Sequence, residues 1–285
     1  MTALVNVIVM TGMLAVVPLG LALIGLPAWT RHLWLAGAVA GVTSLWLPRG
    51  SVAVTLAVIY ALATLPLAAC GAAVVLKAVI HRTPFAFRGL TWAIENQSGG
   101  GVAVGVALGM PVMAATALVA ERGGVRLFGF SLRVLSLTVA HFHFAGFAAA
   151  LTAGLVCRAS GGKAAGVAAW SVPVGTLVVL VGYFTGEWVE FAGAVVLTCG
   201  MWLVGWVIVN DVRAGGVARG LLLVSAGVLA VTMVLALWWA LGEASGVVHP
   251  SLGWMAATHG VGNAFGFGLC GMLAWRMVRK GELDG

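Results

Sequence analysis

The sequence alternates between long apolar runs and short polar interruptions along its whole length. Most runs are about 20 residues long, and the interruptions carry charged residues, Gly or Pro. A stretch of about 18 or more apolar residues can cross a bilayer as a helix. The pattern therefore predicts an all-α fold, a polytopic transmembrane helix bundle of about eight or nine spans. We expect these spans near residues 4–26, 33–47, 52–80, 100–120, 130–157, 165–185, 189–209, 217–241 and 252–278.

Two of these runs need separate treatment. Residues 33–47 are short for a span, so this run is tilted, re-entrant or tightly paired with the next, and without it the count is eight. The first run lacks a basic leader and is longer than a signal-peptide core, so we expect it to be a retained span. No loop is long enough to form a soluble domain. We therefore expect a single integral membrane domain over residues 1–285.

Composition supports a membrane protein. Hydrophobic residues make up 62% of the chain and charged residues 8%, against about 25% charged in soluble domains. The 41 glycines fit closely packed membrane helices. The net charge of +7 is scattered over the ends of runs, which is typical of topology-setting charges and argues against a nucleic-acid partner. The expected partners are the lipid bilayer and a small molecule or ion, and the sequence does not indicate which proteins it binds.

The distribution of Lys and Arg predicts the orientation. With the N-terminus outside, eleven of the fifteen basic residues fall on the cytoplasmic side and four on the outer side. We therefore expect an integral protein of the bacterial cytoplasmic membrane with its N-terminus outside and its C-terminus in the cytoplasm. The main exceptions lie in the segment Glu121–Arg126, which contributes two of the four outer charges.

The candidate chemistry lies in two runs that contain histidines. His141 and His143 lie in the fifth run, and His259 lies in the ninth. Ionisable groups inside a membrane are costly and mark functional sites by default. Both runs would cross in the same direction, and a rise of about 1.5 Å per residue puts His141 and His259 within about 6 Å in depth. These two histidines could therefore share one cavity.

Spacing limits what these histidines can do together. His141 and His143 are two residues apart, so on a regular helix they point about 200° apart and cannot bind one metal. Either they face different neighbours, or the helix is distorted there. His259 and Asn263 are four residues apart and share a face, next to Thr258. We expect His141, His143, His259 and Asn263 to line a small-molecule site, and the alternative is hydrogen bonding between helices.

Two acidic residues could support these histidines. Glu187 and Glu190 lie at the turn between the sixth and seventh runs, on the expected outer side. Together with Thr258 they are candidates to orient a histidine by accepting its N–H, and the glutamates could also relay protons. The alternative is that both glutamates simply end helices at the water interface.

The two histidine motifs resemble those of the YndJ-like family of bacterial multi-pass membrane proteins. The first motif reads His141-Phe142-His143-Phe144-Ala145-Gly146-Phe147, and the second reads His259-Gly260-Val261-Gly262-Asn263-Ala264-Phe265-Gly266. The resemblance implies membrane localisation, a multi-pass topology and a transporter-like character, and it supplies no catalytic residues. A weaker likeness links the buried histidines to haem-copper-oxidase-like and nitric-oxide-response membrane proteins.

Three functions remain open from the sequence. In the first, the protein binds, and translocates, a small molecule or ion at His141, His143, His259 and Asn263, with histidine coupling the process to protons. In the second, the protein is an intramembrane enzyme acting on a lipid-like substrate. Its cofactor would be a single metal ion or haem with His141, His143 and His259 as ligands. In the third, it is a scaffold whose histidines join helices.

Overall fold

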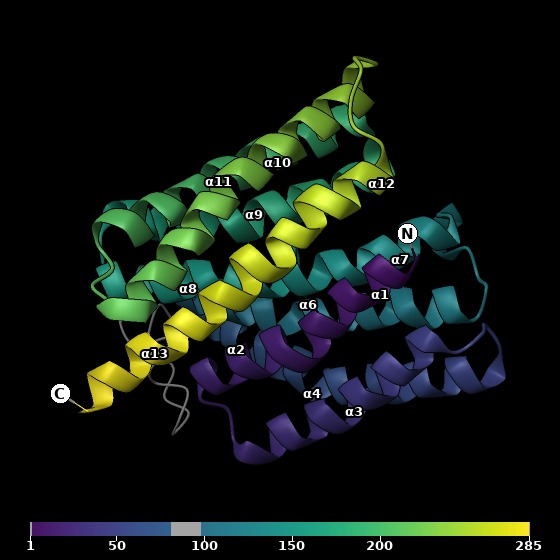
Figure 1. The fold of residues 1–285 in the computed structure, drawn as a ribbon, viewed down its shortest axis with the longest axis horizontal. Helices are drawn as coiled ribbons and strands as arrows, with labels where there is room; N and C mark the ends of the chain where they lie inside the picture. The colour runs from purple at the N-terminus through teal and green to yellow at the C-terminus, as the bar shows by residue number, and fades with distance from the viewer. Residues whose placement is uncertain (1, 81–97, 285) are drawn as a thin grey trace.

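The chain runs back and forth along the long axis of the molecule as a bundle of helices (Figure 1). This computed structural model describes residues 2–80 and 98–284, and within them the chain forms nine helical rods and no strand. A rod is one uninterrupted helical segment, and three of the nine consist of α-helices joined by π-helical turns. The prediction of an all-α bundle is confirmed. The N-terminus and the C-terminus lie at opposite ends of the bundle, as an odd number of passes requires (Figure 1).

The rods match the predicted runs closely, and four of them are divided or flanked by short irregular segments. The helices are α1 (Thr2–Thr11), α2 (Val17–Ile24), α3 (Ala28–Trp46), α4 (Ser51–Ile80), α6 (Ser98–Arg122), α7 (Leu132–His141), α8 (Ala149–Ser160), α9 (Lys163–Thr185), α10 (Glu187–Asn210), α11 (Gly216–Ser245), α12 (Leu252–Met255) and α13 (Cys270–Asp284). The π-helical segments are η1 (Gly12–Val16), η3 (Phe142–Ala148), η4 (Ala256–Gly260) and η5 (Gly262–Leu269), and η2 (Leu127–Gly129) is a 3₁₀ turn.

Seven of the described rods are long and apolar enough to cross a bilayer, which fits a multi-pass membrane protein. The two others are α3 and the last rod, which carry Arg31 and Arg276 among their charged residues. The short run at 33–47 is thus part of a 19-residue helix that begins earlier, at Ala28, and pairs with α4. The pairing was one of the three alternatives that its length left open.

Glycines allow several helices to approach at backbone distance. A Cβ added to Gly71 on α4 would lie 2.4 Å from the carbonyl oxygen of Gly105 on α6. Likewise, a Cβ at Gly175 on α9 would lie 2.5 Å from the backbone nitrogen of Leu197 on α10. Without a hydrophobic driving force between helices in lipid, such close packing supplies the attraction. Helix α6 packs against many neighbours in this way, namely α4, α7, η3, α8 and α9.

A buried charged cluster closes the end of the bundle that contains the N-terminus of the chain. Glu121 and Arg122, at the end of α6, are 1% and 5% exposed and form an ion pair. Arg122 also donates to the carbonyl oxygens of Ser44, Leu45 and Leu47, at 3.1, 3.4 and 3.2 Å, so it caps the C-terminus of α3. Arg49 reaches the same carboxylate, with 2.6 Å between Nη2 and Oε1. Arg49 and Arg122 are two of the four basic residues counted on the outer side, and both neutralise the buried Glu121.

Candidate functional site

All π-helical turns of the described chain gather in one region of the bundle. Segment η1 contacts η3 and η5, η3 contacts η5, and η5 contacts η4. A π-turn adds a residue to a helical turn and breaks the regular hydrogen-bond ladder, and such turns occur frequently at functional sites. These four segments contain or follow every candidate histidine and Asn263. The irregular backbone therefore forms a connected centre that three rods share.

Glycines allow the π-helical segments of this centre to pack closely against one another. A Cβ at Gly12 in η1 would lie only 2.7 Å from the Cβ of His143 in η3. A Cβ at Gly268 in η5 would lie 2.9 Å from the Phe144 ring. Because both contacts are shorter than a real Cβ tolerates, glycine is required for η1, η3 and η5 to meet in this way.

His143 is fully buried and uses both of its ring nitrogens. Its Nδ1 lies 2.7 Å from the carbonyl oxygen of Val139, which can only accept, so Nδ1 carries the proton. Its Nε2 then accepts a hydrogen bond from the Tyr60 hydroxyl at 2.9 Å. Tyr60 lies on α4, so the pair joins the fourth helix of the chain to the π-helical centre. A buried histidine satisfied on both sides is suited to a structural role.

Trp34 completes this aromatic cluster from α3. Its Nε1 donates to the carbonyl oxygen of Met13 at 2.8 Å, and Met13 lies in η1, where the helical ladder is interrupted. The Trp34 ring meets Tyr60 and His143 edge-on, with centroid distances of 5.5 and 6.4 Å. The indole thus satisfies a backbone carbonyl of a π-turn and packs against the buried histidine.

His259 belongs to a second, separate network. Its Nδ1 lies 2.8 Å from the carbonyl oxygen of Thr232 on α11, and its Nε2 lies 2.9 Å from Nδ2 of Asn263. The Thr232 hydroxyl donates to Oδ1 of Asn263 at 2.8 Å. Since carbonyls only accept, these contacts fix a neutral His259 with its proton on Nδ1, and they fix the Asn263 amide with Nδ2 toward His259. The predicted sharing of one helix face by His259 and Asn263 is what makes this network.

His141 differs from the other two histidines. It is half-buried at the end of α7, and within the part of the chain that the structure describes its ring makes no hydrogen bond. It does lie close enough to His259 for charges on the two rings to interact. Unlike His259, His141 therefore has its ring nitrogens available.

The structure resolves the two options for His141 and His143. The helix is distorted between them, since α7 ends at His141 and the π-helical segment η3 begins at Phe142. His143 then bonds to Tyr60 in the aromatic cluster, whereas the His141 ring is within electrostatic range of His259. The candidate residues thus divide into two groups and do not line a single pocket wall.

The expected supporting residues lie elsewhere. Thr258 donates to the carbonyl oxygen of Trp254 in its own helix, at 2.9 Å. Glu187 and Glu190 lie in the first turn of α10, and neither makes a hydrogen bond to a histidine within residues 2–80 and 98–284. The carboxylate that does pair with a histidine is Glu243, whose Oε1 lies 3.1 Å from Nε2 of His249.

His141, His143 and His259 do not form a shared ligand set in the part of the chain that the structure describes. Among the described residues no three His, Cys, Asp or Glu side chains converge as metal ligands. His143 and His259 each have both nitrogens in hydrogen bonds, which leaves no lone pair directed at a common point. The geometry therefore gives no support to the predicted ligand role of His141, His143 and His259.

Three participants were missed from the sequence, namely Trp34, Tyr60 and Thr232. Tyr60 is one of only two tyrosines in the chain and lies in the middle of an apolar run, away from the interface where tyrosine is common. That position is a signal that could have identified it. Thr232 gives no such signal, because threonine in a membrane helix commonly bonds its own backbone.

Comparison with known proteins places the chain in one family. The family model described as "YndJ-like protein" matches residues 7–267. This range reaches into all nine rods, leaves out residues 2–6 of α1, the end of η5 and all of α13, and includes both histidine motifs. No curated protein and no solved structure matches the chain.

Proposed function

Because the chain belongs to the YndJ-like family, a family match that by itself assigns no activity, we propose a function from the site alone. We propose a transporter-like protein of the bacterial cytoplasmic membrane that binds a small molecule or ion, in a proton-linked manner, beside His141 and His259. The observation that carries this proposal is the contrast among the histidines. His141 has no hydrogen-bond partner among the described residues, although it lies inside a membrane rod beside a second imidazole.

The cost of such an arrangement argues for a role. A polar ring inside a membrane segment costs free energy unless it is paired, so an unpaired one is retained where a partner comes and goes. π-helical turns inside α-helices occur frequently at functional sites. His141 directly precedes the π-helical segment η3, and His259 lies in the π-helical segment η4.

The site is suited to hold one proton at a time. His259 is fixed as a neutral acceptor toward Asn263, so a proton on its Nε2 would meet the N–H of the Asn263 amide. Its protonation would require the Asn263 amide to turn over and the Thr232 hydroxyl to donate to the carbonyl oxygen of Leu229, 3.3 Å away, in place of Oδ1 of Asn263. A proton or a hydrogen-bonding solute therefore goes to His141, and a second positive charge on the pair is repelled.

The scaffold hypothesis applies to His143 rather than to the whole set. The bonds of its ring to Tyr60 and to Val139 leave it no capacity for a ligand. We assign it to joining α4 with the π-helical centre, and we assign binding to His141 with support from His259 and Asn263.

The charges of the bundle support the proposed orientation, with the N-terminus outside and the C-terminus cytoplasmic. The described basic residues Arg31, Arg158, Lys163, Arg213 and Arg276 belong to the end of the bundle that contains the C-terminus. At the other end, Arg49 and Arg122 pair with Glu121. Arg82 and Arg88, which were counted toward the cytoplasmic side, lie outside the described residues.

The proposal is tested by proton flux through the purified protein in liposomes. Vesicles containing a trapped pH-sensitive dye are given a K⁺ diffusion potential with valinomycin, and internal pH is followed over time. We expect the wild-type protein to carry protons faster than protein-free vesicles, and we expect His141→Ala to fall to the protein-free rate. His249→Gln, a histidine change at the bundle end, should keep the wild-type rate. Equal flux for the wild type and His141→Ala, or no flux in either, overturns the proposal.

A further inference from the structure

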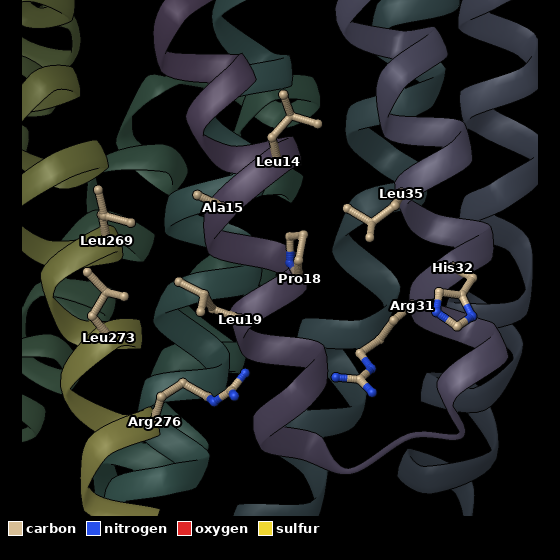
Figure 2. Close-up of a pocket in the computed structure, with 10 residues that line it drawn as sticks. All are labelled: Leu14, Ala15, Pro18, Leu19, Arg31, His32, Leu35, Leu269, Leu273 and Arg276. Atoms are coloured by element: carbon tan, nitrogen blue, oxygen red, sulfur yellow. The ribbon is translucent and has the colours of Figure 1, made fainter.

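An open groove runs along the outside of the bundle between α3, the first rod and the last rod. Its volume is about 560 Å³. Most of its lining is apolar, with Leu14 on η1, Leu35 on α3, and Leu269 and Leu273 on the last rod. Figure 2 shows Leu14 on the first rod, with Leu35 on one side of it and Leu269 and Leu273 on the other. Leu14, Leu35 and Leu273 are 38–39% exposed, so the groove opens sideways toward the lipid.

One end of the groove is basic. Arg31 and His32, at the start of α3, and Arg276 on α13 line it there. Figure 2 shows the Arg31 and Arg276 side chains extending from α3 and α13 toward α2, which lies between them. The groove therefore has a cationic end and an apolar length, which is the polarity of a lipid molecule.

The two guanidinium groups have nothing to neutralise them within the chain as described. Neither Arg31 nor Arg276 makes an ion pair or a hydrogen bond with the side chains described within residues 2–79 and 99–280. Other arginines of this bundle are engaged: Arg219 donates to the carbonyl oxygens of Ile208, Val209 and Val212, and Arg122 pairs with Glu121. Two unpaired guanidinium groups beside one apolar groove are suited to bind an anion that comes from outside the chain.

We propose that this groove binds an anionic phospholipid of the surrounding bilayer. The phosphate lies against Arg31 and Arg276 at the basic end, and one acyl chain follows Leu14, Leu35 and Leu269 into the membrane. Basic pockets between transmembrane helices on the cytoplasmic side are typical sites for anionic headgroups. A soluble phosphate would leave the apolar length of the groove unused. A zwitterionic lipid would bring its own cation against the two arginines.

The proposal predicts a lipid preference that depends on both ends of the groove. The probes are dioleoyl phosphatidylglycerol and dioleoyl phosphatidylcholine, added to the detergent-solubilised full-length protein, and binding is measured by native mass spectrometry. Two arginines near a headgroup should favour phosphatidylglycerol about 30-fold in apparent Kd. The double variant Arg31→Gln/Arg276→Gln should lose this preference. The control Lys163→Gln/Arg213→Gln removes two exposed charges at the same bundle end and should retain it.

A third variant tests the apolar length and guards against a folding defect in the arginine variant. Leu273→Trp keeps both arginines and narrows the groove at a side chain that is already partly exposed, so it should weaken phosphatidylglycerol binding. Wild-type protein without a preference for phosphatidylglycerol overturns the proposal. So does an equal loss in the Lys163→Gln/Arg213→Gln control, which would indicate a general charge effect. Full binding by Leu273→Trp, or displacement of the lipid by inorganic phosphate alone, would indicate a headgroup site without a lipid groove and equally overturns it.

Discussion

The hydroxyl of Tyr60 lies 2.9 Å from Nε2 of His143, and this contact joins α4 to the π-helical centre of the bundle. Both side chains are completely buried. The bond on the other side of the imidazole, from Nδ1 to the carbonyl oxygen of Val139, sets the tautomer that makes Nε2 an acceptor. Tyr60 is therefore the donor, and it has no other polar partner among the described residues.

Removal of the Tyr60 hydroxyl should destabilise the protein. Tyr60→Phe leaves Nε2 of His143 buried and unpaired, and we expect a loss of about 1–2 kcal/mol in the free energy of unfolding. The chain offers a matched control in its only other tyrosine, Tyr183, which is 41% exposed. Thermal unfolding in mild detergent measures both. If Tyr60→Phe and Tyr183→Phe melt together with the wild type, the Tyr60–His143 bond contributes nothing to stability.

Gly12 should tolerate no side chain. Gly12→Ala places a methyl group 2.7 Å from the Cβ of His143, which has no freedom to move away. We expect a loss of about 1–3 kcal/mol from overpacking. Gly227 on α11 has no atom within 4 Å of an added Cβ, so Gly227→Ala should leave stability unchanged or slightly improved. Unfolding of the two variants side by side checks the difference, and equal stability would contradict the close approach of η1 to η3.

The sequence predicts the rods well because their signal is local. Apolar run length is a property of each segment alone, and the limits of the rods fall within a few residues of the expected ones, except at α3 and α13. The expectation that His141 and His259 lie at similar depth likewise uses only the helical rise per residue. Both predictions use only the order of residues along the chain.

The partners of the histidines could not be predicted in the same way. Tyr60 and His143 are 83 residues apart, and His259 and Thr232 are 27 apart, so each contact depends on which helices pack together and in what rotation. A π-turn also rotates every side chain that follows it, and no residue pattern in Phe142–Ala148 specifies where the extra residue is inserted. The separation of His141 from His143 already follows from their spacing of two residues on a helix.

The buried charge at the end of α6 should matter far more than its exposed partner. Glu121→Gln keeps the shape of the side chain but leaves Arg122, which is 5% exposed, without its counter-ion. We expect a loss of about 3–5 kcal/mol in the free energy of unfolding, and a low yield of folded protein. Arg49 has a half-exposed side chain, so Arg49→Gln should cost only about 0–1 kcal/mol. Comparable losses from the two variants, measured by thermal unfolding, would show that Arg122 does not depend on Glu121.

The proposed orientation can be checked by cysteine labelling in intact cells. The four native cysteines, none of them in a disulfide, are first replaced by serine or alanine. Val248→Cys, at a position 86% exposed between α11 and α12, should then react with a membrane-impermeant maleimide added outside. Gly215→Cys, between α10 and α11, should react only after the membrane is permeabilised. The reverse pattern would place the N-terminus in the cytoplasm.

The cap that Arg122 makes on α3 has a consequence for synthesis of the protein. Helix α3 is not among the rods apolar enough to insert on their own account, and its C-terminal carbonyls are satisfied by a guanidinium that follows Leu47 by 75 residues. When α3 leaves the ribosome, neither α4 nor that arginine has yet been made. We therefore expect α3 to stay only partly packed beside the insertion machinery until α6 has been synthesised. Helices α1 to α4 would then complete their packing only after α6 has inserted.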